Sequence, residues 1–286
     1  ISLAHQKVYS IPLLLMVGWR GSPKSNDEPQ HKAKGEITLK LLKLLNIKYV
    51  ILRNDKDFEK LSKLIKYSKK KNSITACVIE NGILKSKLKK KNLIDTYKLD
   101  KELFFKNLLK NLKENHLIIS STGFNSRELF YYRKKFNCYK GKDFYLVGGM
   151  GHTSSVSLGI NFIKKKKKII CLDGDGSFLM HMGSLNTVSH YASKNLKYIL
   201  INNNSHDSVG GQKTFSDKIN FRYLVKSFGF NSYTLIKDKK NLNSKIQKFL
   251  NNNKKSFLEV KISNNKVKNL PRPKNLKEIK FHIMDN

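Results

Sequence analysis

The amino-acid sequence predicts an α/β protein made of two units, each a parallel sheet flanked by helices. Short apolar runs typical of strands alternate with longer amphipathic stretches typical of helices, an order that produces helix-covered parallel sheets. A lysine-rich, weakly periodic segment separates two such series. We therefore expect a first unit at 1–80, a linker at 81–99, a second unit at 100–262 and a surface tail at 263–286.

The first unit is expected to be truncated at its start. The apolar run at 11–19 is far shorter than the roughly 20 residues that a membrane-spanning helix needs, so we interpret it as a buried strand. This strand follows almost directly after Ile1, which suggests that the chain begins inside a domain. The other expected elements are a polar loop at 20–35, a helix at 38–46, a strand at 48–52, a helix near 57–69 and a strand at 73–80.

The second unit should begin with a helix in residues 100–115. Asp100 is a candidate N-cap, and Leu103, Phe104, Leu108 and Leu112 share one helical face. The elements expected after it are strands at 117–121, 144–149, 168–173, 196–203 and 256–262, with helices starting within 121–129 and at 154–163 and 177–192.

The charge of the chain is strongly positive. Lysine and arginine total 57 against 21 acidic residues, a net charge of +36, which is typical of proteins that bind nucleic acid or anionic membranes. Lysine dominates over arginine, however, and is accompanied by abundant Asn, Ile, Tyr and Phe, which share A/T-rich codons with it. We therefore expect no nucleic-acid or membrane partner; a basic nucleic-acid-binding protein is the alternative from another class.

The cysteines indicate a reducing compartment. Cys77, Cys138 and Cys171 are odd in number and have no CxxC spacing, which is typical of a cytoplasmic protein.

Residues 168–203 combine two apolar runs with an amphipathic stretch between them. A right-handed strand–helix–strand crossover makes the strands parallel, so Asp175 and Asn203, which follow them, would lie at the same sheet edge. A carboxylate, a carboxamide and loop carbonyls are hard oxygen ligands suited to Mg²⁺. The pattern therefore predicts a magnesium site at this edge.

The residues around Asp175 are suited to an anionic ligand. Gly174 and Gly176 remove Cβ atoms where such a ligand would approach the backbone. A helix starting near Ser177 would point its unpaired N–H groups at the ligand. Together with the metal, these features indicate a bound diphosphate.

The GDG triplet, its distance from the NN pair and the crossover between them resemble the thiamine diphosphate binding motif. The resemblance implies thiamine diphosphate and Mg²⁺ as cofactors, with Asp175, Asn203 and the backbone carbonyl of Ser205 as metal ligands. It also implies that 1–80 is the C-terminal part of a pyrimidine-binding domain and that 100–262 is a diphosphate-binding domain.

Two further turns resemble parts of thiamine enzymes. GGMGH resembles the turn that supports the cofactor, which implies that Met150 lies beneath it and that the Gly148 carbonyl accepts a hydrogen bond from its 4′-amino group. STGFNSREL resembles a turn near the diphosphate, which implies Thr122 and Gly123 as further contacts.

The segments NNNSHDSVGGQKT and GWRGSPKSNDEPQH resemble the phosphonopyruvate decarboxylases, of which the sulfopyruvate decarboxylases are near relatives. The resemblance covers nearly the whole chain, with Asn204 in place of a usual Gly and Gly149 in place of a usual Ser. It implies a carboxy-lyase that converts 3-phosphonopyruvate into phosphonoacetaldehyde and CO₂. His206, Asp207 and Gln212 are the candidates to contact substrate, and a histidine suits proton transfer near neutral pH.

This family activates its cofactor with a glutamate that lies ahead of the segment matched here. Glu28 and Glu36 follow that segment, so neither corresponds to it. Sites of this family lie between subunits, which implies a homo-oligomer. Arg20 and Arg127 are weaker candidates for holding a phosphonate; Arg127 could equally pair with its neighbour Glu128 or cap a helix.

Other functions stay open on this sequence. The substrate could be sulfopyruvate or another 2-oxo acid. The chain could also be a non-catalytic remnant or partner subunit that binds the cofactor without turning substrate over.

Overall fold

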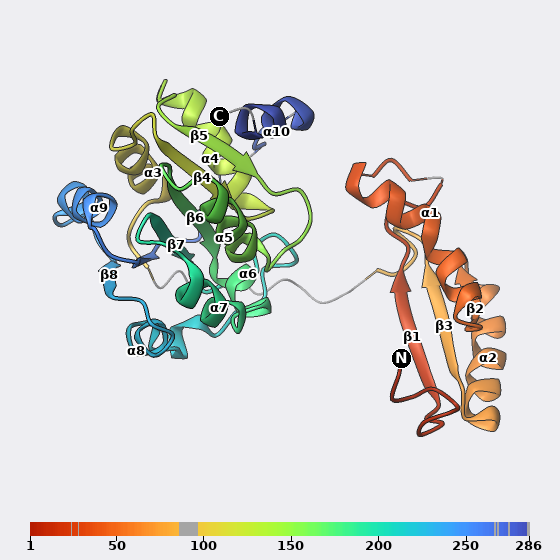
Figure 1. Ribbon diagram of the computed structural model, residues 1–286. Coiled ribbons are helices and arrows are strands. Elements are labelled where there is room, and N and C mark those ends of the chain that lie inside the picture. Colours follow the sequence, from red (N-terminus) through yellow and green to blue (C-terminus); the bar gives the residue numbers. More distant parts are fainter. Residues whose placement is uncertain are drawn as a thin grey trace. The chain divides into compact units, whose positions relative to one another are not determined.

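The computed structural model describes residues 1–23, 25–27, 29–85, 97–265, 267, 269–273 and 275–284 of the 286-residue chain. The chain divides into two compact units, and the division falls within 86–96, outside the described residues (Figure 1). The expected linker at 81–99 therefore lies largely outside them too. Both units contain a parallel sheet flanked by helices, which confirms the predicted fold class.

The first unit has a three-stranded parallel sheet in the order β1-β3-β2. Its elements are β1 (Leu13–Gly18), α1 (Pro29–Leu44), β2 (Lys48–Leu52), α2 (Asp57–Lys71) and β3 (Ile74–Ile79). The polar loop predicted at 20–35 is wrong in its second half, because α1 already begins at Pro29. Proline suits the first helical position, since it has no N–H group that could be left unpaired there.

Strand β1 is not the buried strand that the sequence predicted. Leu13, Leu15 and Val17 pack against the core of the unit, but Met16 on the other face is 55% exposed. Successive side chains of a strand point to opposite faces, and β1 is one of the two edge strands of this sheet. One face of β1 is therefore only partly covered within this unit.

The second unit has a six-stranded parallel sheet in the order β5-β4-β6-β7-β9-β8. Its elements are α3 (Lys101–Lys110), β4 (His116–Ser120), α4 (Phe124–Lys135), β5 (Lys142–Tyr145), α5 (Thr153–Ile163), β6 (Lys168–Gly174), α6 (Asp175–Met180), α7 (Ser184–Tyr191), β7 (Leu196–Asn202), the short helix η1 (Ser216–Lys218), α8 (Phe221–Ser227), β8 (Ser232–Ile236), α9 (Leu242–Asn251), β9 (Ser256–Lys261) and α10 (Leu276–Met284).

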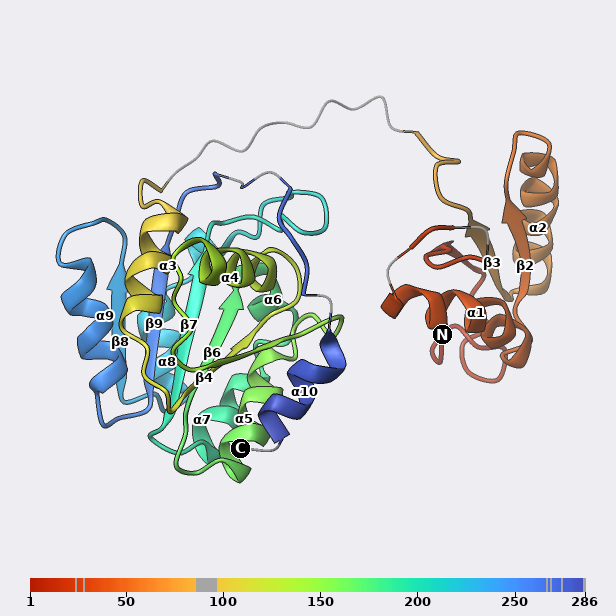
Figure 2. The same cartoon turned by 90° about the horizontal axis from the view of Figure 1, so that it is seen from above.

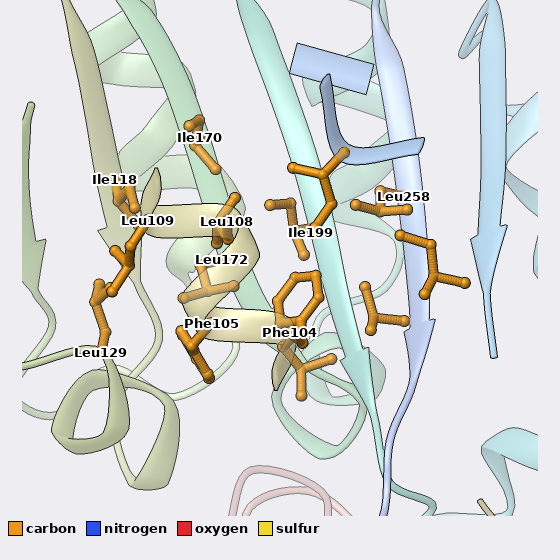
Figure 3. Packing of buried hydrophobic residues seen from close by; sticks show 14 of the residues in the cluster. Phe104, Phe105, Leu108, Leu109, Ile118, Leu129, Ile170, Leu172, Ile199 and Leu258 are labelled. Atoms are coloured by element: carbon orange, nitrogen blue, oxygen red, sulfur yellow. The ribbon is translucent and has the colours of Figure 1, made fainter. Parts of the chain in front are cut away.

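Helices cover both faces of this sheet (Figure 2). On one face, side chains of α3, α4 and α9 pack onto alternate strand residues such as Ile170 and Leu172. On the other, α6, α7 and α8 pack onto the intervening residues, including Cys171. Figure 3 shows Phe104 and Phe105 of α3 directed at the first of these faces. The sheet that carries the candidate site is therefore buried on both sides, as expected for parallel strands.

The start of α3 agrees with its prediction. The Asp100 carboxylate accepts a hydrogen bond from the Glu102 N–H at 2.7 Å, which satisfies an otherwise unpaired donor of the first turn. Of the face proposed for this helix, Phe104, Leu108 and Leu112 are fully buried, whereas Leu103 is partly buried.

Two elements predicted in this unit are wrong. The strand expected at 144–149 is instead β5, which ends at Tyr145, because Gly148 and Gly149 adopt positive φ angles of +81° and +63°. The single helix expected at 177–192 is divided into α6 and α7. The break falls at His181, whose φ of −138° and ψ of 39° lie outside the helical region, whereas Gly183 has helical angles and directly precedes α7.

No elements were predicted within residues 204–255, which form η1, α8, β8 and α9. The expected surface tail ends in α10, where Ile279 and Ile283 pack against the second unit. Across all the described ranges, no helix combines the length and the apolar character needed to cross a membrane.

The order of the strands determines where a ligand can bind. From β4 the chain first crosses to β5 on one side, and β6 and β7 then follow on the other side. The loops after β4 and β6 therefore diverge in opposite directions and leave a crevice between them. In open α/β sheets such a crevice, at the carboxyl ends of the strands, is where ligands bind.

The buried histidine of β4 should make stability depend on pH. Burial, assisted by Lys168 and Lys113, lowers the pKa of His116 to about 4, while an unfolded histidine titrates near 6.5. The unfolded chain thus binds the proton first, so the contribution of His116 is intact above about pH 6.5 and is lost as the pH falls toward 4. We expect the free energy of unfolding to fall between pH 7 and pH 4.5 by about 1–3 kcal/mol more in wild type than in His116→Asn. Urea titrations at the two pH values measure both losses. Equal losses in both proteins would contradict the prediction.

Candidate active site

A pocket lies at the carboxyl ends of the strands of the second unit. Its lining comes from the loops after β4, β5, β6 and β7, together with the first residue of α3. Of the residues predicted for the site, it includes Thr122, Met150, Gly174, Asp175, Gly176, Ser177, Asn203, Ser205, His206 and Asp207. The crossover expected from β6 to β7 is present, since the two strands are parallel neighbours. It brings Asp175 and Asn203 to the same pocket.

Asp175 is held by two hydroxyl groups from a distant part of the chain. Its Oδ2 accepts hydrogen bonds from Thr214 Oγ1 at 2.5 Å and from Ser216 Oγ at 3.0 Å. Burial raises the pKa of the Asp175 carboxyl, and these two hydrogen bonds oppose the rise. Within the described part of the chain, no lysine or arginine pairs with Asp175. A bound cation would therefore stabilise its ionised form.

The asparagines after β7 serve different purposes. The Asn203 amide group donates to Asp207 Oδ2 at 2.7 Å, and its Oδ1 accepts from the Ser205 N–H at 3.2 Å. Asn202 instead lies behind the pocket, where its Oδ1 accepts from Ser216 Oγ at 2.7 Å. Asn203 is therefore the member of the pair that lines the pocket, as predicted.

The structure gives a reason for one departure from the pattern of the resembling decarboxylases, Asn204 in place of the expected glycine. The φ of Asn204 is +58°. Asparagine tolerates this left-handed conformation better than other residues with a side chain. The replacement therefore retains the backbone turn that follows the asparagine pair.

The loop after β7 folds back on itself over the pocket. His206 N–H donates to the Gln212 carbonyl at 2.7 Å, and Ser205 pairs with Lys213 in an antiparallel bridge. Asp207 accepts from Ser205 Oγ at 2.9 Å in addition to its bond from Asn203. Asp207 thereby ties the two expected metal-binding residues to the loop.

Gly176 leaves the space that His206 fills. A Cβ atom at Gly176 would lie 2.4 Å from His206 Nδ1, closer than two such atoms can approach. At Gly174 the nearest atom to a Cβ would be Asn125 Nδ2, at 3.0 Å. The sequence suggested that these glycines make room for an anionic ligand. The structure shows that they also make room for the protein side chains packed around Asp175.

We expect Gly176→Ala to displace His206 and with it the adjacent Ser205, whose carbonyl is an expected metal ligand. Binding of magnesium pyrophosphate should then weaken by about 10-fold, the size of one weakened charge-assisted contact. Isothermal titration calorimetry would measure the change. Gly159→Ala is the matched control, since a Cβ there meets no atom within 4 Å. The control should bind normally and gain about 0.5–1 kcal/mol of stability. Normal binding by the Gly176 variant would show that the space is not needed.

The GGMGH turn stands beside the same pocket. Met150 lines it, while Gly148 does not, although the Gly148 N–H donates to Thr122 Oγ1 at 3.3 Å. The Gly151 N–H donates to Ser177 Oγ at 3.0 Å, which links this turn to the start of α6. The turns after β4, β5 and β6 are therefore joined by hydrogen bonds.

Some predicted residues lie away from the pocket wall. The Gln212 side chain is exposed beside Gly210, and Gly123 precedes α4, where a Cβ would meet Ser208 at 3.0 Å. Arg127 donates to the Gly123 carbonyl at 3.3 Å and lies over the Phe124 ring. Neither Gly123 nor Gln212 is among the lining residues.

In the first unit, Nε and Nη2 of Arg20 each donate a hydrogen bond of 2.7 Å to the Asp27 carboxylate. Glu36 lies exposed on α1, and Glu28 is outside the described residues.

Several residues of the site were missed by sequence reasoning. Thr214 and Ser216 support Asp175, and Glu259 accepts from the Asn202 amide at 3.0 Å. Lys101 and Asn125 line the pocket. Small polar residues, and one lysine in a lysine-rich chain, form no sequence pattern that marks them as site residues. Their contacts are therefore seen only in the three-dimensional structure.

The residues present fit a bound magnesium ion and diphosphate. The donors offered by Asp175, Asn203 and the Ser205 carbonyl are all hard oxygens, and among the described residues no lysine or arginine forms an ion pair with the buried carboxylate. The described residues contain no group of three or more His, Cys, Asp or Glu arranged for a metal. A site with a single carboxylate leaves coordination positions for phosphate oxygens and water.

Comparison with known proteins agrees with this geometry. Residues 122–260 match the model of the thiamine pyrophosphate enzyme C-terminal TPP binding domain; thiamine pyrophosphate is another name for thiamine diphosphate. A phosphonopyruvate decarboxylase of Streptomyces viridochromogenes is 28% identical over 241 residues, which are 77% of this chain and 58% of the relative. The chain thus spans little more than half the length of that relative.

Two other relatives match shorter stretches of the chain. The beta subunit of sulfopyruvate decarboxylase from Methanocaldococcus jannaschii is 35% identical over 130 residues, which are 45% of this chain and 66% of the relative. The acetolactate synthase large subunit of Porphyra purpurea is 26% identical over 113 residues, 35% of this chain and 19% of the relative. The matched domain contains the GDG triplet and the NN pair from which the resemblance was predicted. Residues 122–260 are therefore similar to the C-terminal TPP-binding domains of thiamine pyrophosphate enzymes, and the predicted resemblance to the phosphonopyruvate decarboxylases is confirmed.

Proposed function

We propose that this chain is part of a thiamine diphosphate and Mg²⁺ dependent decarboxylase that converts 3-phosphonopyruvate into phosphonoacetaldehyde and CO₂. The observation that carries the proposal is the pocket at the ends of β6 and β7, where Asp175, Asn203 and Ser205 come together. The similarity to phosphonopyruvate decarboxylases over 77% of the chain supports the choice of substrate.

The residues of the pocket would divide the work of binding. Asp175, Asn203 and the Ser205 carbonyl would hold the magnesium ion and, through it, the diphosphate. Met150 would support the cofactor from the neighbouring turn. When bound, thiamine diphosphate supplies the carbon that attacks the keto group and accepts the electrons released with CO₂.

Proton transfer would fall to His206. It lines the pocket next to Gly176 and is half-buried, so it can contact both substrate and solvent. Both Asp207 oxygens are already bound, to Ser205 and Asn203, so Asp207 would position the metal-binding loop. Gln212 would close that loop through its carbonyl.

Sulfopyruvate is the second candidate substrate. The beta subunit of sulfopyruvate decarboxylase has the higher identity, 35%, although over a shorter stretch. Both compounds are small 2-oxo acids with a terminal tetrahedral anion, so the same pocket could take either. That relative is named as a beta subunit, which supports assembly of several chains. For this chain we propose a homo-oligomer whose sites lie between subunits and receive the activating glutamate from a pyrimidine-binding domain.

The test is an assay of the protein that contains this chain, supplied with thiamine diphosphate, MgCl₂ and each 2-oxo acid in turn. We expect phosphonopyruvate to yield equal amounts of CO₂ and phosphonoacetaldehyde. Turnover of sulfopyruvate alone would select the second candidate. Cofactor binding without turnover of either acid would indicate a non-catalytic partner subunit or remnant.

A further inference from the structure

A buried ion pair lies at one side of the pocket. Lys101, the first residue of α3, places its Nζ 3.1 Å from Glu128 Oε1 of α4. The two side chains are 4% and 0% exposed, respectively, and Lys101 lines the same pocket as Asp175 and Asn203. Two charges removed from water are stabilised only if their remaining donors and acceptors also find partners.

This pair is incompletely satisfied. An ammonium group has three N–H donors, and the one hydrogen bond that Lys101 Nζ makes with described residues goes to Glu128. Glu128 Oε2 is buried without a hydrogen-bond partner in the described part of the chain. Unused donors on a buried cation at a pocket wall are suited to an anionic acceptor from outside the protein.

The surroundings of Lys101 favour a tetrahedral anion. Thr122, Asn125 and Ser208 line the pocket together with it and supply neutral hydrogen-bonding groups. Among the described lining residues, Lys101 carries the single fixed positive charge, whereas Asp175 and Asp207 are acidic. A ligand with several negative oxygens therefore needs this lysine in addition to a metal ion.

We propose that Lys101 is an anion-binding residue whose Nζ contacts phosphoryl or phosphonyl oxygens of the ligand in this pocket. This inference rests on the proposed function, because the cofactor diphosphate and the substrate phosphonate are the two sources of such oxygens there. Glu128 holds the ammonium group in place and does not itself contact the anion.

The first test titrates the 286-residue chain with magnesium pyrophosphate in a calorimeter. Lys101→Met should bind at least about 10-fold more weakly, the size expected for one charge-assisted contact. Lys101→Arg, which keeps the charge, should stay within about threefold of wild type. Lys110→Met removes the same charge from an exposed position of the same helix and should bind like wild type.

A second titration, with phosphonoacetate in the presence of saturating magnesium pyrophosphate, separates the two sources. A loss confined to pyrophosphate assigns Lys101 to the cofactor diphosphate. A loss confined to phosphonoacetate assigns it to the substrate phosphonate. Lys101→Met binding both compounds like wild type would overturn the inference.

Two further comparisons keep the outcome clear. Lys101→Met leaves the Glu128 carboxylate buried without its partner, which could unfold the protein. The effect of Lys101→Met is therefore also measured with Glu128 replaced by glutamine, by comparing Lys101→Met/Glu128→Gln with Glu128→Gln alone. A difference of about 10-fold for at least one of the two anions is expected there, and equal binding of both anions overturns the inference even if the single variant unfolds. A wild-type chain that binds neither magnesium pyrophosphate nor thiamine diphosphate would overturn the proposed function and this inference with it, whereas normal wild-type binding with unaffected Lys101 variants overturns the inference alone.

Discussion

Asp175→Asn should weaken binding of thiamine diphosphate in the presence of Mg²⁺ on the order of 100-fold or more, the usual cost of removing one partner from a buried charge pair. The substitution keeps the size of the side chain and its contacts with Thr214 and Ser216, but it removes the one buried charge that would hold the ion. Calorimetric titration of both proteins at equal magnesium concentration measures the effect.

The matched control for this prediction is Asp217→Asn. Asp217 is also acidic and belongs to the same segment as Ser216, but it is exposed and does not line the pocket. It should change affinity by less than about twofold, as expected for a surface charge. Chelation of magnesium should weaken wild-type binding to the level of Asp175→Asn and should leave the variant unchanged. Equal affinities of wild type and Asp175→Asn would exclude Asp175 as the metal ligand.

Phe104→Ala should lower the free energy of unfolding of the second unit by about 3–5 kcal/mol, the range for a fully buried phenylalanine. The Phe104 side chain is completely buried between α3 and the sheet, where its ring meets Phe105 edge to face at 5.7 Å (Figure 3). Removal of the ring leaves a cavity that the surrounding strands cannot fill. Urea denaturation followed by circular dichroism measures the loss.

Phe281→Ala provides the comparison for this stability prediction. Phe281 lies on α10 and is 53% exposed, so its removal should cost less than about 0.5 kcal/mol. A similar loss in both variants would mean that burial does not determine the effect. Since α3 begins at Lys101, the Phe104 variant should also weaken anion binding if the helix no longer holds that lysine at the pocket.

Local patterns predicted the strands and helices of both units well where one pattern filled a whole element. The apolar run at 168–173 and the amphipathic stretch at 57–69 correspond closely to β6 and α2. The predictions failed where a local pattern was ambiguous. Residues 177–192 keep one apolar side over their whole length, yet the backbone leaves the helical conformation at His181, which gives two helices that both pack on the sheet.

The residues of the candidate site were likewise predictable only in part. Asp175 and Asn203 were predicted because two parallel strands end at one sheet edge, and this rule depends only on the order of elements along the chain. Thr214 and Ser216 could not be predicted in this way. They reach Asp175 through a loop that folds back over the pocket, and their own sequence neighbourhood is an ordinary polar segment.

The α/β class, the alternation of the elements and the pair of residues proposed to bind the metal could be predicted without coordinates, because they follow from periodicity and from chain order. The residues that surround that pair could not. Lys101 and Glu128 lie in different helices, and the hydroxyls around Asp175 come from a loop far along the chain. Such contacts depend on how elements pack in three dimensions, and short polar side chains and single charges leave no periodic trace of that packing in the sequence.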